Sequence, residues 1–173
     1  MAFQNHYFQQ LPAKQKTPRM IEYLKNAGLL PQKTDCETGP YVGKIIAAAG
    51  DRMKVFGDIL NIAEFFVADV DLVIDETAFA KTFTKQEGKP DARALLAGFR
   101  DVLAAVELFE VAPLEAALQT FVAERGIKAG DLVHPVRLAL CGKTVGMGLY
   151  DTLAILGRER CLSRIDRMLA RVV

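Results

Sequence analysis

The sequence is poor in the residues from which catalytic and metal sites are usually built. It has no tryptophan, two histidines (His6 and His134) and three cysteines (Cys36, Cys141 and Cys161). The odd number of cysteines and the lack of a C-x-x-C spacing favour reduced thiols over a disulfide framework or a zinc site. The histidines belong to no H-E-x-x-H motif and to no Ser-His-Asp set. We therefore expect no catalytic residue, no metal and no cofactor in this chain.

Long apolar runs are also missing. No stretch approaches the roughly 18 apolar residues that mark a membrane-spanning helix, and the first residues lack the charged-then-apolar pattern of a signal peptide. We expect a cytoplasmic protein without membrane association.

The chain has 173 residues, of which 51% are hydrophobic and 25% charged. That length suffices for one globular domain or two small ones.

Charge is unevenly distributed along the chain. The net charge is +1, but residues 1–50 carry +3, residues 51–124 carry −7 and residues 125–173 carry +5. A polyanion would be attracted to the two basic ends and repelled by the acidic middle. Random variation of surface charge is the alternative explanation.

Apolar residues recur with the 3.6-residue period of α-helices in nearly every segment. We therefore predict an all-α protein. A shift in composition near Ala68 predicts two small helical bundles, residues 1–67 and 68–173, with residues 1–17 as a connecting segment of the first. Residues 67–74 show no partner strand and are predicted to form a linker.

Cap residues predict where several helices begin and end. Thr17 and Pro18 suit the N-cap and the first position of a helix, and Pro135 suits the first turn of another. A long helical run is predicted from Met53 to Phe66. The other predicted caps are Asp51, Asp75 and Asp91 at N-termini and Gly28 and Gly126 at C-termini.

Two glycine motifs imitate nucleotide-binding loops without completing them. Gly142-Lys143-Thr144 has the end of a phosphate-binding P-loop, but the first glycine of that motif would fall at position 137, which is Arg137. Gly146 and Gly148 match two glycines of a dinucleotide fingerprint, whose third position is Asp151. We therefore expect no nucleotide binding by either route.

The last helical run is amphipathic and rich in arginine. One stripe carries apolar residues, and the other face carries Arg158, Arg160, Arg164, Arg167 and Arg171. Exposed arginines beside a glycine-rich loop suit a module that grips a phosphate backbone. An ordinary solvated face is the commoner explanation of such a pattern.

Three motifs close to the end of the chain resemble the C-terminal end of bacterial glutamyl-tRNA synthetase. They occur in the order and at the spacing of that family. The motifs are Pro135-x-Arg137-x-Ala139-Leu140-x-Gly142, Gly148-Leu149-Tyr150 and Leu156-Gly157-Arg158-Glu159-Arg160-x-Leu162-x-Arg164-Ile165. Asp51-Arg52-x-Lys54 and Phe3-x-Asn5-x-x-Phe8 resemble earlier segments of the same family.

The resemblance implies a non-catalytic tRNA-binding piece made of two small helical domains. The family's "HIGH" and "KMSKS" signatures of ATP-dependent amino-acid activation do not occur here. The implied partners are tRNA(Glu) and a catalytic half, supplied in cis or in trans, and we expect tRNA binding that weakens steeply with salt. The implied anticodon-binding residues are Arg52, Arg137, Gly146, Met147, Leu149 and Tyr150, with Lys143 and Arg164 as possible phosphate contacts.

Arg52 matches the family's arginine at the third anticodon base, which implies a module that discriminates between anticodons. The alternative is a surface arginine paired with Asp51 or with another carboxylate.

Two departures from the family motif support a different function. Cys141 replaces the usual threonine, and Gly146-Met147 replaces Ser/Thr-Pro, so each departure removes a hydroxyl group. They favour, as the alternative, a stand-alone helical protein with an interaction or regulatory role.

Overall fold

The computed structural model describes residue 8 and residues 11–84 and 88–172. These residues form helices and no strand, so the predicted all-α class is confirmed. The chain separates into two compact units, residues 1–67 and 68–173. Phe3, Asn5 and His6 lie outside the described residues.

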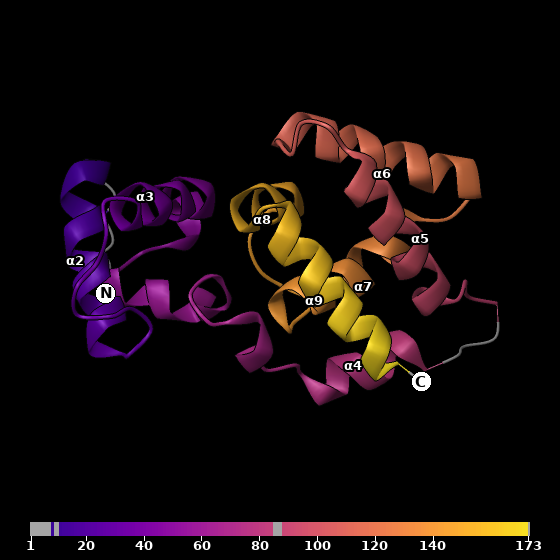
Figure 1. The fold of residues 1–173 in the computed structure, drawn as a ribbon, viewed down its shortest axis with the longest axis horizontal. Helices are drawn as coiled ribbons and strands as arrows, with labels where there is room; N and C mark the ends of the chain where they lie inside the picture. The colour runs from indigo at the N-terminus through magenta and orange to yellow at the C-terminus, as the bar shows by residue number, and fades with distance from the viewer. Residues whose placement is uncertain (1–7, 9–10, 85–87, 173) are drawn as a thin grey trace. The chain divides into compact units, whose positions relative to one another are not determined.

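The first unit contains α2 (Ala13–Asn26), α3 (Thr38–Ala49) and the short 3-10 helices η1 (Gly50–Arg52) and η2 (Phe56–Phe65) (Figure 1). Helix α2 packs against both α3 and η2. Fully buried side chains from each of them form the core, because each presents one apolar face to the others. The residues are Met20, Leu24, Val42, Ile45 and Ile59.

The predicted start of α2 at Thr17 and Pro18 is wrong. The helix begins at Ala13, with Pro12 at its N-cap, and the carbonyl of Pro12 accepts from the amides of Gln15 and Lys16 at 2.9 and 3.2 Å. Alanine, lysine and glutamine are good helix formers, and they extend the helix past the proline toward the N-terminus. Pro18 removes only one hydrogen bond close to the helix start.

The long helical run predicted from Met53 to Phe66 is interrupted. The side chain of Asp58 accepts from the amides of Lys54 and Val55, at 2.7 and 3.0 Å, and Val55 is extended. Ile62 then departs from helical geometry. The predicted run therefore forms only η2, and Asp51 lies within the separate η1 rather than capping one long helix. The hydroxyl of Tyr41 donates to the carbonyl of Phe65, at the end of η2, at 3.0 Å.

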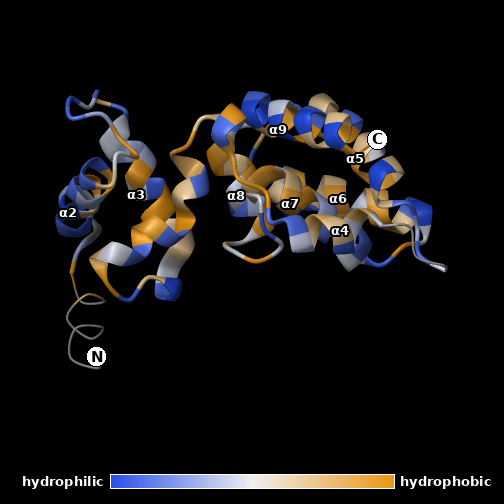
Figure 2. Cartoon of the chain, turned by 90° about the horizontal axis from the view of Figure 1, so that it is seen from below, coloured by the Kyte–Doolittle hydropathy of each residue, from blue (hydrophilic) through white to orange (hydrophobic). Residues whose placement is uncertain are grey.

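The described residues of the second unit form the 3-10 helix η3 and six α-helices (Figure 1). Helix α9 packs against α5 and α7, and α6 packs against α8. Figure 2 shows α7 as hydrophobic along most of its length, in agreement with its many buried side chains. The elements are η3 (Asp69–Asp71), α4 (Glu76–Phe83), α5 (Ala92–Ala105), α6 (Val111–Arg125), α7 (Ala129–Cys141), α8 (Leu149–Leu156) and α9 (Arg158–Arg171).

Three predicted caps of the second unit are confirmed. Asp75 accepts from the amide of Ala78 at 2.9 Å and caps α4. Asp91 accepts from the amides of Arg93 and Ala94 and caps α5. Gly126 ends α6 in the left-handed conformation, with φ of 60°. Cap chemistry is local, so these positions follow from the sequence alone.

The predicted start of α7 at Pro135 is wrong. The helix begins six residues earlier, at Ala129. The side chain of Asp131 accepts from the amide of Lys128 at 3.1 Å and so stabilises the true N-terminus. Pro135 is buried inside the helix, where its ring packs in the core at the cost of one backbone hydrogen bond.

Candidate nucleic-acid interface

The α7–α8 loop, residues 142–148, is held by hydrogen bonds at its C-terminal end (its far end), where it meets α8. The guanidinium of Arg137 donates to the carbonyl of Met147 at 2.6 Å. The hydroxyl of Thr152 donates to the carbonyl of Gly148 at 2.8 Å, one turn into α8. The motif residue Arg137 thus contacts the turn from which other predicted site residues come.

Arg137 is half-buried, and a guanidinium has five N–H donors. Within the described ranges, the carbonyl of Met147 is the one hydrogen-bond acceptor found for it. The other donors are therefore available to a ligand at this turn. Donors fixed in a planar fork suit the acceptor edges of bases and phosphate oxygens.

The predicted anticodon turn divides into buried and accessible residues. Met147 and Leu149 are only 3% and 5% exposed, so their side chains pack in the core of the second unit and do not form an outward surface. Gly146 is exposed and Tyr150 is half-buried. Of the side chains near this turn, Tyr150 therefore has the aromatic surface on which a base could stack.

Two further observations describe the chemistry of the α7–α8 loop. Burial and the nearby carboxylate of Glu115 raise the pKa of Tyr150, so its phenol keeps its proton and can donate a hydrogen bond. Val145 is 72% exposed. Val145 is not among the residues predicted from the sequence, although an apolar residue between Thr144 and Gly146 in a glycine-rich loop was a usable signal.

The departure from the family motif at Cys141 lies inside the protein. Its side chain is buried at the last position of α7. Met147, which stands where the family has proline, is also buried, so the substitutions at these two positions change packing in the core. Gly146, which stands where the family has Ser/Thr, is exposed, so the hydroxyl missing there is lost from the surface. The alternative function therefore stays a hypothesis, supported by the departure at Gly146.

Arg52 is exposed in η1 and belongs to the first unit, whereas the other predicted site residues belong to the second. Within the part of the chain that the structure describes, Arg52 forms no ion pair, so the alternative of a salt bridge with Asp51 is wrong. Its guanidinium is open to solvent and available to a ligand. Lys143 is half-buried, and its contact with phosphate stays a prediction.

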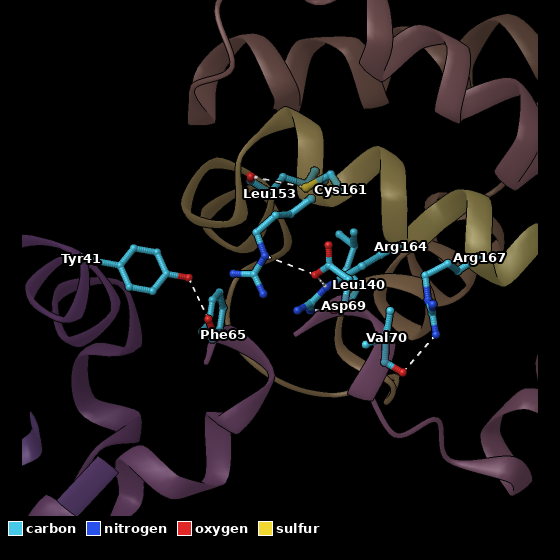
Figure 3. A network of polar contacts seen from close by, with 10 residues as sticks. Tyr41, Phe65, Asp69, Val70, Leu140, Leu153, Cys161, Arg164 and Arg167 are labelled. Carbon is cyan, nitrogen blue, oxygen red and sulfur yellow. Dashed lines mark hydrogen bonds and ion pairs between the residues drawn. The ribbon is translucent and has the colours of Figure 1, made fainter. Parts of the chain in front are cut away.

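The predicted exposed basic face of α9 is only partly confirmed. Arg167 and Arg171 are exposed, but Arg164 is buried, which contradicts its predicted phosphate contact. Arg164 is 2% exposed, and its Nε donates to Asp69 at 2.7 Å. Arg160 also donates to Asp69, at 3.2 Å, and Arg167 donates to the carbonyl of Val70 at 3.1 Å (Figure 3). The acidic segment 69–75, which begins the second unit, thus covers Arg164 and accepts hydrogen bonds from Arg160 and Arg167.

The two arginines at the ends of α9 are also bonded to the protein. Arg158 donates to the carbonyls of Val106 and Glu107, and Arg171 forms an ion pair with Glu76. All five arginines of α9 thus have an acceptor within the second unit. These arginines therefore connect α9 to neighbouring segments of the second unit, and this role accounts for most of them without a binding surface.

The ion pairs of Asp69 predict how stability depends on pH. Although partial burial opposes ionisation, hydrogen bonds and charge from Arg164 and Arg160 lower the pKa of Asp69 below its usual 3.8. The folded state then binds this proton less tightly than the unfolded state. The contribution to stability is complete above about pH 4 and is lost as pH falls through the lowered pKa.

We expect the free energy of unfolding to fall more steeply with acid in the wild type than in Asp69→Asn. Urea unfolding followed by circular dichroism from pH 6 to pH 3 measures this difference. Asp71→Asn is the matched control, because Asp71 is exposed and forms no ion pair with the described residues. Parallel pH profiles for the wild type and Asp69→Asn would contradict the expectation.

A cavity of about 390 Å³ borders the α7–α8 loop on the side of Thr144 and His134. Its three aspartates, Asp75, Asp91 and Asp131, already accept backbone N–H groups at the starts of helices. No group of three or more His, Cys, Asp or Glu residues suited to a metal ion occurs among the residues that the structure places.

None of the helices in the described ranges is long and apolar enough to cross a membrane.

Comparison with known proteins identifies the family. The family model "Anticodon binding domain" matches residues 15–169, which include most of both units. The chain is 35% identical over 162 residues to a glutamate–tRNA ligase of Moorella thermoacetica, with 94% of this chain and 32% of the ligase covered. It is 32% identical over 166 residues to that of Desulforudis audaxviator, with 95% and 32% covered.

A solved structure has the same fold. The glutamate–tRNA ligase of Elizabethkingia meningosepticum, crystallised with its amino acid, superposes with a TM-score of 0.81 at 22% identity, over 99% of this chain and 32% of the ligase. The chain thus spans about a third of the length of the relatives that it matches. By its match over residues 15–169, the chain belongs to the anticodon-binding domain family, in the form found in glutamate–tRNA ligases.

Proposed function

We propose that this chain is the tRNA-binding module of a glutamate–tRNA ligase and that it recognises the anticodon of tRNA(Glu). It is non-catalytic alone. The relatives over most of this chain are glutamate–tRNA ligases, and about two thirds of their length has no counterpart here. A catalytic half, in cis or in trans, would supply amino-acid activation.

The observation that carries this proposal is the arrangement of Arg137 at the α7–α8 loop. One N–H group of the guanidinium is fixed to the carbonyl of Met147 at 2.6 Å, which orients the others. Tyr150 and the exposed Val145 lie on the same short segment and supply aromatic and apolar surface. Unpaired bases are recognised by such stacking surfaces and by donors directed at their edges.

Arg52 supplies a second recognition group in the first unit. It is exposed and free of ion pairs with the described residues, so ligand binding need not break a salt bridge. A module that uses Arg52 and Arg137 would read bases, while other lysines and arginines contact phosphates and set the affinity. This division of roles predicts that anticodon substitutions reduce binding.

Filter binding of a tRNA(Glu) transcript to the full chain tests the proposal. We expect binding that weakens as salt concentration rises, and affinity at least about tenfold lower for the same transcript with a replaced anticodon. A tRNA of unrelated anticodon serves as the second comparison. Equal affinity for all three RNAs would overturn anticodon recognition, and no binding of any RNA would overturn the function as a whole.

A further inference from the structure

Arg164 is an unusual residue in the second unit. Its side chain is 0% exposed, although arginine is almost never fully buried unless it is paired. A buried ion pair adds little stability compared with apolar packing, because both charges lose their water. The presence of an arginine at this position therefore calls for a reason other than stability.

The two ends of the guanidinium bond to different parts of the unit. Its Nε donates to Asp69 of η3 at 2.7 Å, and one of its terminal nitrogens donates to the carbonyl of Leu140 (Figure 3). Leu140 is the second-to-last residue of α7. Backbone carbonyls at this end of a helix receive no hydrogen bond from an N–H group of the same helix. Arg164 thus caps the end of α7 from a helix that follows it in the chain.

The acidic segment 69–75 is also hydrogen-bonded to Gly142, the first residue of the α7–α8 loop. The amide of Asp75 donates to the carbonyl of Gly142 at 2.8 Å. The amide of Gly142 donates in turn to the carbonyl of Leu138 at 2.9 Å. The near end of the loop is therefore fixed by segment 69–75 and by Arg164, while Arg137 and Thr152 hold its far end.

We propose that Asp69 and Arg164 are positioning residues for RNA recognition. Asp69 orients the guanidinium of Arg164, which holds the end of α7 and so fixes where the α7–α8 loop presents its accessible residues. A guanidinium suits this role because its planar fork can bond a carboxylate and a carbonyl at the same time. This inference rests on the proposed function, because it assigns the loop to RNA.

The test uses Arg164→Lys in the full chain. Lysine keeps the positive charge but has one terminal nitrogen, so it cannot bond Asp69 and Leu140 in the same geometry. Arg167→Lys is the matched control, because Arg167 lies on the same helix and is exposed, and lysine can keep the single hydrogen bond that Arg167 donates to the carbonyl of Val70. Asp69→Asn is the second variant, used if Arg164→Lys does not fold.

Amide hydrogen exchange of residues 142–148 without RNA is the first measurement. We expect exchange about tenfold faster in Arg164→Lys and in Asp69→Asn, and unchanged exchange in Arg167→Lys. Unchanged exchange in both Arg164→Lys and Asp69→Asn would overturn the inference, whether or not the protein binds RNA. This measurement does not depend on the proposed function.

The second measurement is the ratio of affinities for the tRNA(Glu) transcript and for the same transcript with a replaced anticodon. We expect that ratio to fall about tenfold in Arg164→Lys. Partial unfolding would lower binding of both RNAs by the same factor and leave the ratio unchanged. Faster exchange with an unchanged ratio would overturn the positioning role, and no RNA binding by the wild type would instead overturn the proposed function.

Discussion

Replacing Gly142 with alanine is expected to destabilise the second unit by roughly 2–5 kcal/mol. Gly142 has φ of 73°, a left-handed conformation that costs an L-residue roughly 1–2 kcal/mol. A Cβ atom at this position would also lie 1.9 Å from the carbonyl oxygen of Val73. That neighbour is backbone, so relief requires segment 69–75 to move away from α7, at a further cost of roughly 1–3 kcal/mol.

Gly126→Ala is the matched control for this substitution. Gly126 also follows a helix in the left-handed conformation, with φ of 60°, but a Cβ atom there would meet nothing within 4 Å. We therefore expect a loss of only about 1–2 kcal/mol. Thermal and urea unfolding of the full chain compare the two variants, and the melting temperature of Gly142→Ala should fall by roughly 10 °C or more. Equal losses of stability in the two variants would show that the contact between the new Cβ atom and the carbonyl oxygen of Val73 does not destabilise Gly142→Ala.

The second large effect is expected from Arg52→Gln on anticodon discrimination. The third anticodon base of a glutamate tRNA is cytosine, whose O2 and N3 both accept hydrogen bonds. A guanidinium offers donors only, so it suits cytosine and meets the N1–H donor of guanine badly. We expect the preference for terminal cytosine over guanine to narrow by roughly 1–3 kcal/mol, the size of one good base contact.

The measurement is filter binding of two tRNA transcripts that differ only in the last anticodon base. Folding should be unchanged, because Arg52 is exposed and has no ion pair within the described residues. Lys44→Gln is the control, because Lys44 is an exposed cation of α3 in the same unit. Lys44→Gln should leave the preference intact. Equal losses for both transcripts on mutating Arg52 would assign it to the phosphate backbone.

Local chemistry explains which parts of the fold could be predicted from the sequence. The helical class follows from a 3.6-residue apolar period, and Asp75, Asp91 and Gly126 mark helix ends through contacts within four residues. The two misplaced prolines show the limit of such rules. Pro18 and Pro135 lie in the second turn of their helices, where each removes one backbone hydrogen bond, so neither marks the helix start.

The candidate site was harder to predict because it depends on distant parts of the chain. The periodicity of α9 separates an apolar face from a charged one, but it cannot tell that Asp69, 95 residues away, covers Arg164. Met147 and Leu149 likewise occupy positions of a recognition motif while their side chains fill the core. Arg52 and Arg137 were selected by motif, and their roles in binding stay predictions.

The hydrogen bonds and ion pairs of the α9 arginines affect how strongly RNA binding should depend on salt concentration. Each protein cation that neutralises a phosphate releases bound counterions and adds about 0.7–0.9 to the slope of log affinity against log salt. Five free arginines on α9 would add roughly 4 to that slope. Arg160, Arg164 and Arg171 are already paired with carboxylates and so are less able to neutralise a phosphate, whereas Arg158 and Arg167 bond only neutral carbonyls and keep their charge. Binding by the second unit should therefore resist salt better than its arginine content indicates.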